Sequence, residues 1–451
     1  MDPARESAVD VLVAWDPAKR FAKDLLGEVR EKTPDPRDRG LAREIVLGVA
    51  RRRATIDHLL TGVSATPLWR LDPVVRAALR AALAQLLFLD RVPAHAAVDG
   101  AVEIVKARAN ARLAGFVNGV LRTLVRGIEG PATGAEDPRR DVPRAGSVAL
   151  RLRTVAFPAT TPSPDRNLAL RFAHPEWLVA RWRARHGDAA ARSMLEAGIS
   201  RAPVVLRARG SDRDAVLAAL VAAGVSASAG AGPSEIRVTT ADPSSLAAVR
   251  DGFASAEGST VQRTAPLLDA RPGDRILVLR ASPGGAVLHV ADLLAGRGEV
   301  VAADVEAEKV GALAAYLASR LPAGGVRVDA VLVPRDGPLP FAPGSFHGVL
   351  VEAPSTETGI LRRRPEACDR LRAGDVLAFA RAAHALLERA APLVRPGGRL
   401  VFATRSVEPE EGEGLVAAFA AEHPELRLEP GYDVLPSLAD DGGFAAVLRL
   451  G

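Results

Sequence analysis

Hydrophobic residues change their spacing along the chain, and this change divides the sequence into regions of different predicted structure. In residues 1–127, apolar residues recur at i, i+3 and i+4, which is the period of one buried helix face. Helices are predicted at 4–15, 41–52, 72–88, 96–109 and 111–126. Asp72-Pro73 supplies an N-cap and an N1 proline for the third helix. Helices this close in sequence predict a compact all-helical bundle.

From Phe253 onward, short apolar runs alternate with helical patterns, as a parallel α/β sheet requires. The predicted strands are 275–280, 300–305, 328–333, 348–353, 399–404 and 444–450, and the predicted helices are 286–296, 306–320 and 375–394. We therefore expect residues 256–451 to form one α/β domain.

The stretch Arg275–Val305 has the order strand, glycine turn, helix, strand, acid. A Ser282-Pro283-Gly284-Gly285 turn follows the first strand, and Asp304 ends the second. Glycines let a ligand approach the backbone, and an acid at that strand end is placed to bind ribose hydroxyls. The pattern favours a nucleotide-like cofactor, although an ordinary βαβ unit with a glycine-rich turn remains the alternative.

Two regions of different composition lie between the helical and the α/β parts. Residues 128–170 are rich in Pro, Gly, Ser and Thr and predict a linker that is partly extended or mobile. Residues 171–255 predict a small α/β unit. Its elements are two helices within 174–197 that break near Gly187, strands at 204–208 and 235–239, and helices at 212–223 and 244–251.

Composition describes a globular protein of several domains. The 451 residues suggest about three domains, and no apolar run approaches the ~20 residues of a membrane span. The N-terminus lacks the pattern of a signal peptide, so we expect a cytoplasmic protein. One cysteine, Cys368, and eight scattered histidines argue against disulfide frameworks and cysteine-rich metal sites, and we expect no metal.

Positive charge is concentrated at the start of the chain. The formal net charge is +5, and residues 1–127 carry 21 Lys and Arg against 15 Asp and Glu, a balance of +6. Clustered positive charge suits a polyanion such as RNA. Solvated helix faces explain it equally well, so charge alone does not decide the partner.

Several phrases resemble a known family. DRGLAREIVLGVARRRATIDHLL, VPAHAAVDGAVEIVKAR and LAGFVNGVLRTLVR resemble the NusB-like domain of bacterial Sun (RsmB)-type ribosomal RNA cytosine-C5 methyltransferases, and HPEWLVARW resembles the start of that family's RNA-recognition-motif-like subdomain. The resemblance implies a multi-domain chain with an all-α NusB-like bundle at 1–127 and an RRM-like subdomain at 171–255. A Rossmann-like class I methyltransferase domain that uses S-adenosyl-L-methionine (SAM) would occupy 256–451.

The resemblance also implies site residues. The cofactor would be bound by Ala281, Ser282, Pro283, Gly284, Gly285, Asp304, Asp336 and Glu352. Arginines that suit RNA phosphates are Arg51, Arg52, Arg53, Arg122, Arg362 and Arg363. The implied partner is ribosomal RNA, with no membrane and no metal, and we expect a monomer.

The catalytic residues of the family are replaced in this chain. The family's reaction needs a thiolate that adds to C6 of cytosine, and it uses two cysteines after its fourth and fifth strands. Ser355 and Arg405 stand in these two positions. The strand acid and the loop lysine of the family are also replaced, by Val278 and Ala286.

These replacements lead to three hypotheses. The first is a member of the family that binds RNA, and SAM as well, but is impaired or inactive in thiol-dependent methyl transfer, a pseudoenzyme. The second is an RNA methyltransferase of altered chemistry, in which Glu352 and Ser355 orient another target atom. The third is a non-enzymatic module that binds RNA or the transcription machinery.

Overall fold

The computed structural model describes residues 2–17, 24, 27, 33, 35–210, 212–240, 243–321 and 324–451. The chain forms two compact units. Unit 1 holds Met1–Arg201 and Leu361–Ala373, and unit 2 holds Ala202–Ile360 and Gly374–Gly451. A short segment of the C-terminal sequence thus folds with the N-terminal part.

The helices predicted in the first 127 residues are confirmed. They are α1 (Pro3–Ala14), α3 (Pro36–Val63), α4 (Pro73–Phe88), α5 (Ala94–Arg108) and α6 (Ala111–Gly127), with a 3-10 turn η2 (Leu68–Arg70) before α4. The Asp72 side chain accepts the amide of Val74 at 2.8 Å and so caps α4 as predicted. Their apolar faces form one continuous core that includes Ile45, Leu79 and Val117.

Residues 128–170 are folded, in contrast to the linker predicted from composition. A three-stranded sheet contains β1 (Ile128–Pro131), β2 (Asp141–Arg144) and β3 (Ser147–Leu152) in the order β1-β3-β2, and α7 (Pro164–Phe172) and α8 (Glu176–Ile199) follow. Asp141 receives two hydrogen bonds from the Arg151 guanidinium, at 2.7 and 2.8 Å. The Asn167 amide donates to the carbonyls of Pro138 and Pro158. These polar contacts add to apolar burial, because Val142, Leu150 and Phe157 belong to the same core as the N-terminal helices. Within α8, Gly187 (φ 77°) makes the predicted break.

The small sheet of unit 2 has four strands in the order β5-β6-β4-β7. They are β4 (Val204–Ala208), β5 (Ala227–Ala229), β6 (Glu235–Val238) and β7 (Ala254–Ala256), with helices α9 (Arg213–Ala222) and α10 (Ala247–Arg250) and the turn η3 (Pro243–Ser245). Strands β4 and β6 were predicted, whereas β5 and β7 are three residues long and were missed.

The large sheet of unit 2 has seven strands in the order β10-β9-β8-β11-β12-β14-β13. They are β8 (Arg275–Leu279), β9 (Glu299–Asp304), β10 (Arg327–Leu332), β11 (Phe346–Glu352), β12 (Val394–Thr404), β13 (Leu426–Val434) and β14 (Gly443–Leu450). The first five are parallel to one another, and β14 is antiparallel to β12 and β13. Six of the seven strands were predicted.

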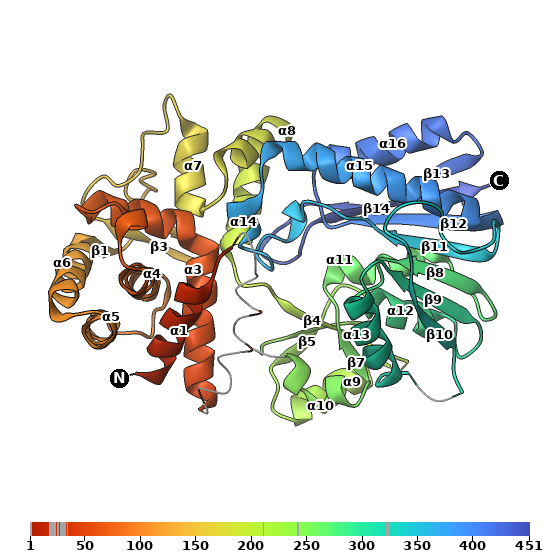
Figure 1. Ribbon diagram of the computed structural model, residues 1–451, viewed down its shortest axis with the longest axis horizontal. Helices are drawn as coiled ribbons and strands as arrows, with labels where there is room; N and C mark the ends of the chain where they lie inside the picture. The colour runs from red at the N-terminus through yellow and green to blue at the C-terminus, as the bar shows by residue number, and fades with distance from the viewer. Residues whose placement is uncertain are drawn as a thin grey trace. The chain divides into compact units, whose positions relative to one another are not determined.

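Helices cover both faces of this sheet (Figure 1). α12 (Gly285–Leu293) and α13 (Ala307–Ala318) pack on one face with Ile276 and Val278, and α15 (Ala373–Ala390) and α16 (Glu413–Glu422) pack on the other with Leu277 and Leu279. Short pieces connect these elements, namely α11 (Ser259–Gln262), α14 (Ala367–Arg370), η4 (Ala265–Leu268), η5 (Thr358–Ile360), η6 (Ala391–Leu393) and η7 (Pro409–Glu411). Alternate strand residues therefore enter two separate cores, and this explains the continuous apolar runs.

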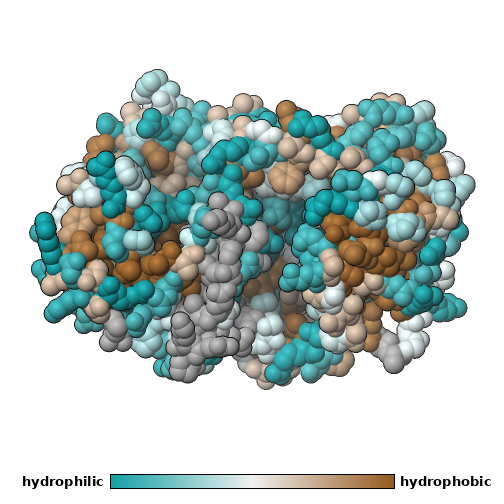
Figure 2. Space-filling view, viewed as in Figure 1, coloured by the Kyte–Doolittle hydropathy of each residue, from teal (hydrophilic) through white to brown (hydrophobic). Residues whose placement is uncertain are grey.

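Most of the surface visible in Figure 2 is hydrophilic, with smaller hydrophobic groups among the polar side chains. None of the helices in the described ranges is long and apolar enough to cross a membrane.

Candidate functional site

Six of the eight predicted cofactor residues, Ala281–Gly285 and Asp304, lie where β8 and β9 end. Asp304 is the last residue of β9 and is 4% exposed. Its Oδ2 accepts the amide of Ser282 at 3.2 Å, and its Oδ1 accepts the amide of Val305 at 2.8 Å. The structure therefore brings the Ala281–Gly285 turn and Asp304 together, as the strand–turn–helix–strand pattern predicted.

Gly284 sets the shape of this turn. Its φ is 112°, a backbone conformation that side chains disfavour. A Cβ built on Gly284 would lie 2.8 Å from Leu313 Cδ1 and 2.9 Å from Tyr316 Cδ1, both on α13. Only glycine suits both the dihedral angle and the space, so the turn lies close against α13.

The donor and acceptor groups at this edge fit a ribose. An ionised carboxylate offers about four acceptor positions, and the two backbone amides occupy two of those on Asp304. Two acceptor positions on Asp304 therefore remain for the two hydroxyl groups of a ribose. Asp304 is therefore suited to the role that its position at the strand end predicted.

Asp336 lies in the loop after β10 and not at the ends of β8 and β9. It is exposed and lies four residues beyond the end of β10, which pairs with β9. The Arg389 guanidinium holds the loop by donating to the carbonyls of Pro334, Arg335 and Gly337 at 2.7, 2.8 and 2.6 Å. This loop is ordered, and a contact of Asp336 with adenine stays a prediction.

A second group of predicted residues lies where β11 and β12 end. Glu352 ends β11, which pairs with β12, and Arg405 directly follows β12. Arg405 Nη2 lies 3.5 Å from Glu352 Oε2, which makes a loose ion pair. Burial raises the pKa of Glu352 above its usual value, and the positive charge of Arg405 opposes part of that shift. A carboxylate and a guanidinium thus face each other at the ends of β11 and β12.

Ser355 lacks an activating base within the described part of the chain. Among the residues that the structure describes, its hydroxyl accepts the amide of Glu357 at 3.3 Å, and no imidazole is hydrogen-bonded to it. Cys368 lies in the segment that folds with unit 1, and burial raises the pKa of its thiol far above the usual range. Neither residue has the environment of an activated nucleophile.

A buried hydrogen-bond network joins the loops after β11 and β12, and the sequence had not indicated it. Glu411 accepts the amide of Thr356 at 2.8 Å and the hydroxyl of Thr356 at 2.5 Å. Ser406 Oγ lies 3.2 Å from Thr356 Oγ1 and 3.1 Å from Thr358 Oγ1. Burial raises the pKa of Glu411 to about 7, against the effect of the hydrogen bonds from Ser406 and Thr356. Glu411 belongs to an acidic run, EPEEGEG, that resembles an exposed loop.

The replacements Val278 and Ala286 lie in an apolar environment. Both side chains are buried in the core between the large sheet and α12. Apolar side chains at these two positions add to the packing of that core.

The arginine triplet predicted to contact RNA is mainly structural. Arg52 is 5% exposed, donates to the carbonyls of Pro143 and Ile199, and lies over the ring of Phe88 at 4.4 Å. Burial lowers the pKa of Arg52 to about 9 and that of Arg51 to about 10. Arg53 pairs with Asp369 at 3.2 Å. Arg52 and Arg53 therefore make contacts within unit 1, and the buried Arg52 is not available to a phosphate.

The other predicted arginines differ in exposure. Arg122 is exposed on α6, and its Nε donates to Asn118 at 2.9 Å. Arg362 is 2% exposed and donates to Ser200 Oγ at 3.4 Å, whereas Arg363 is half-buried. Arg122 remains available to bind RNA, and Arg362 does not.

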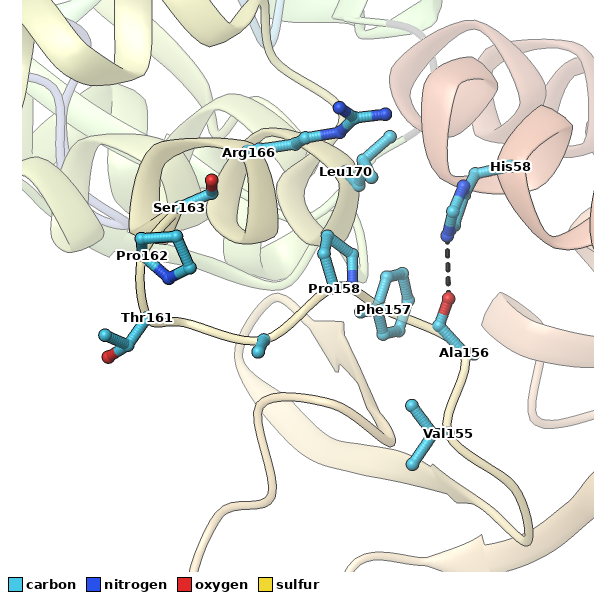
Figure 3. Close-up of a pocket in the computed structure, with 11 residues that line it drawn as sticks. His58, Val155, Ala156, Phe157, Pro158, Thr161, Pro162, Ser163, Arg166 and Leu170 are labelled. Atoms are coloured by element: carbon cyan, nitrogen blue, oxygen red, sulfur yellow. Dashed lines mark hydrogen bonds between the residues drawn. The ribbon is translucent and has the colours of Figure 1, made fainter.

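Unit 1 contains a cavity of about 430 Å³ between α3, the segment before α7, and α7 itself (Figure 3). His58 Nε2 donates to the carbonyl of Ala156 at 2.7 Å, and the His58 ring stacks on Phe157. None of the predicted site residues lines this cavity.

The large sheet, its helices and the Asp304 edge together define the Rossmann-like class of SAM-dependent methyltransferases. Three family models match this chain. They describe the NusB family over residues 2–126, the RsmF/B-like ferredoxin-like domain over 174–243, and the 16S rRNA methyltransferase RsmB/F over 265–436.

Two curated relatives and one solved structure extend the match to nearly the whole chain. Probable ribosomal RNA small subunit methyltransferase B of Bacillus subtilis is 28% identical over 426 residues, which cover 94% of this chain and 89% of the relative. Putative methyltransferase Rv1407 of Mycobacterium tuberculosis is 34% identical over 436 residues, which cover 94% and 88%. The crystal structure of PH0851 has the same fold, with a TM-score of 0.76, 20% identity, and coverage of 99% and 98%.

This chain belongs to the family of ribosomal RNA small subunit methyltransferase B. SAM is the cofactor that membership of this methyltransferase family supports.

Proposed function

We propose that this protein binds ribosomal RNA and SAM but does not carry out thiol-dependent methyl transfer to cytosine C5. The observation that carries this proposal is the Glu352–Arg405 ion pair, in which Arg405 stands where the sequence resemblance predicts the attacking thiol. The relatives are named as ribosomal RNA methyltransferases, and this supports RNA as the ligand.

The chemistry of C5 methylation explains why these replacements matter. Cytosine C5 is weakly nucleophilic until a nucleophile adds to C6. The guanidinium of Arg405 stays protonated and cannot add. The hydroxyl of Ser355 needs a strong base within hydrogen-bond reach, and its partner is a backbone amide. Neither replacement supplies the covalent step.

The cofactor side keeps the groups that SAM needs. Asp304 would bind the ribose, and the backbone of the turn from Ser282 to Gly285 would lie against the rest of the nucleoside. SAM when bound supplies an electrophilic methyl group. The residues of this edge bind and orient that cofactor independently of the missing thiols.

Methyl transfer from labelled SAM to 16S ribosomal RNA tests the proposal. We expect no label at cytosine C5 with the native chain and expect partial activity after restoration of both thiols in Ser355→Cys/Arg405→Cys. Label at C5 with the native chain that disappears in Asp304→Ala would contradict the proposal. Titration of SAM by calorimetry reports cofactor binding separately.

Methylation of a different RNA atom is a second candidate function. The half-buried Glu352 carboxylate at the end of β11 is placed to accept a hydrogen bond from the exocyclic amine of a base, which favours this candidate. Mass mapping of modified nucleosides in a strain that lacks the gene decides it, because an unchanged profile leaves no methylation to assign. If SAM produces neither heat nor a thermal shift, the SAM-binding part of the proposal and the second candidate function both fail. RNA binding alone then remains.

A further inference from the structure

Two histidines and two glutamates from α15 and the end of α16 meet on the surface of unit 2. His384 and Glu388 are one helical turn apart on α15, Glu422 ends α16, and His423 follows it. We infer that these four side chains form a binding site for a divalent transition-metal ion such as Zn²⁺. The site is distinct from the edge formed by Asp304 and Glu352.

The ligand atoms already lie at distances close to those of a metal site. His384 Nε2 is 2.9 Å from Glu422 Oε2, and His423 Nε2 is 2.9 Å from Glu388 Oε1. The ligand atoms of His384, Glu388 and Glu422 all lie within 4.8 Å of one another. In a tetrahedral zinc site, bonds of ~2.0–2.1 Å place the ligand atoms about 3.3 Å apart. These three ligand atoms are close enough to one another to bind one ion, and rotation of the His423 side chain, which pairs with Glu388, would add a fourth ligand.

The two imidazole rings are held in position before any metal binds. Both contact Phe419, a fully buried residue of α16, with ring centroids 5.5 Å away for His384 and 4.3 Å away for His423. His423 Nδ1 also lies 3.2 Å from Glu425 Oε1, which leaves Nε2 as the atom that faces Glu388. A carboxylate on the second ring nitrogen is the usual support of a metal-binding histidine.

The set of donors determines which ion fits. Imidazole nitrogens combined with carboxylate oxygens suit zinc and its neighbours, whereas magnesium and calcium prefer sets of oxygen atoms. The side chains of Glu388 and Glu422 are 43% and 57% exposed, so an ion reaches them from solvent. His384 and Glu422 are 38 residues apart in sequence, and this separation explains why the sequence predicted no metal.

A bound ion would cross-link α15 and α16, which cover the same face of the large sheet. The ion would therefore stabilise the methyltransferase domain. It would leave the Asp304 edge unchanged.

Calorimetric titration of ZnCl₂ into the full chain tests the inference. We expect one site in the native protein and at least about tenfold weaker binding in His384→Ala/His423→Ala. The control His95→Ala removes an exposed histidine of unit 1 and should bind zinc as the native chain does. MgCl₂ at the same concentration should give no comparable heat. We also expect zinc to raise the melting temperature of the native chain and not that of the double variant.

Absence of zinc binding in the native chain, or equal binding by the double histidine variant, would overturn the inference. Comparable binding of magnesium would overturn it as well, because the imidazoles would then have no role. The second variant, Glu388→Gln/Glu422→Gln, keeps both histidines and the shape of the side chains. It should also weaken zinc binding at least about tenfold, and it serves if the histidine variant fails to fold. Far-UV circular dichroism establishes the folding of each variant.

Discussion

The two halves of one sheet edge differ in how much of the family's chemistry they keep. Where β8 and β9 end, the Ser282–Gly285 turn and Asp304 keep the groups that we propose bind the nucleoside of SAM. Where β11 and β12 end, Ser355 and Arg405 occupy the cysteine positions. The parallel strands that present both halves belong to the same sheet.

The difference between the halves has a physical origin. The half near β8 and β9, here called the cofactor half, comprises the Ser282–Gly285 turn and Asp304. It is built from backbone amides, a glycine dihedral angle and one carboxylate that also holds the turn together. Any change there alters the fold of the turn as well as its function. The half near β11 and β12, here called the target half, comprises Glu352, Ser355, Arg405 and the loops that follow the two strands. In the family, this half depends on reactive side chains that contribute little to packing. The strands that precede Ser355 and Arg405 remain paired in the sheet without those reactive side chains, and Arg405 pairs with Glu352.

The largest effect should come from Asp304. In Asp304→Ala, the ribose loses two charge-assisted hydrogen bonds worth about 3 kcal/mol together, so SAM should bind about 100-fold more weakly. Calorimetry with SAM measures this. Asp304→Asn keeps an acceptor for one backbone amide and should give an intermediate loss. If SAM binds Asp304→Ala as tightly as the native chain, the cofactor half has lost its function too.

The free energy of unfolding should depend on pH through Glu411, which joins the loops after β11 and β12 in the target half. Its folded pKa of about 7 lies above the ordinary value of 4.5, so the folded chain holds the proton more tightly than the unfolded chain. This stabilisation is complete below pH 4.5 and is lost as the pH rises through 7. Its size is on the order of 3 kcal/mol. Urea unfolding across this range measures the slope.

Two variants separate Glu411 from the other carboxylates. Glu411→Gln keeps the shape of the side chain and should flatten the stability profile over this pH range. Glu308→Gln changes an exposed carboxylate of α13 and should keep the native profile. Equal slopes in the native chain and in Glu411→Gln would show that Glu411 does not titrate in this range.

Local patterns predicted most elements of the fold, and the exceptions have physical reasons. β13 contains Pro430 and Gly431, which argue against a strand, but it lies at the edge of the sheet and bulges between Pro430 and Tyr432. The composition of residues 128–170 resembles that of a linker, but Leu150 and Phe157 are buried in the core of unit 1 and contacts such as Arg151 with Asp141 add to this burial. Such contacts between distant residues leave no periodic signal in the sequence.

In the candidate site as well, the sequence predicted residues with local signals and missed contacts between residues far apart in the chain. Asp304 and the glycine turn could be located because strand ends and turns have local signals. Glu411 is 55 residues from Thr356, and only the sheet brings them together. Arg52 had been assigned to RNA because of its charge, but its position on the buried side of α3 depends on tertiary packing.

Gly284 tests whether the cofactor half depends on backbone shape. Gly284→Ala forces a side chain into a φ of 112° and within 3 Å of Leu313 and Tyr316, so we expect a loss of about 2 kcal/mol. The matched control Gly311→Ala lies within α13 with open space around its Cβ and should be neutral or stabilising by about 0.5–1 kcal/mol. Chemical denaturation compares the two variants. A loss in Gly311→Ala as large as that in Gly284→Ala would mean that the turn geometry is not the cause.

The smallest effect should come from Arg405, and this prediction sharpens the contrast between the halves. The Arg405 and Glu352 side chains are 38% and 22% exposed and 3.5 Å apart, so their pairing contributes at most about 1 kcal/mol. Arg405→Ala should leave SAM affinity within about twofold of native, similar to the control Arg427→Ala on β13. Without the guanidinium, the pKa of Glu352 should rise further, because burial is then opposed by less positive charge. If Arg405→Ala weakens SAM binding as strongly as Asp304→Ala, the two halves act as one site, and the replacements near β11 and β12 belong to the binding of the cofactor.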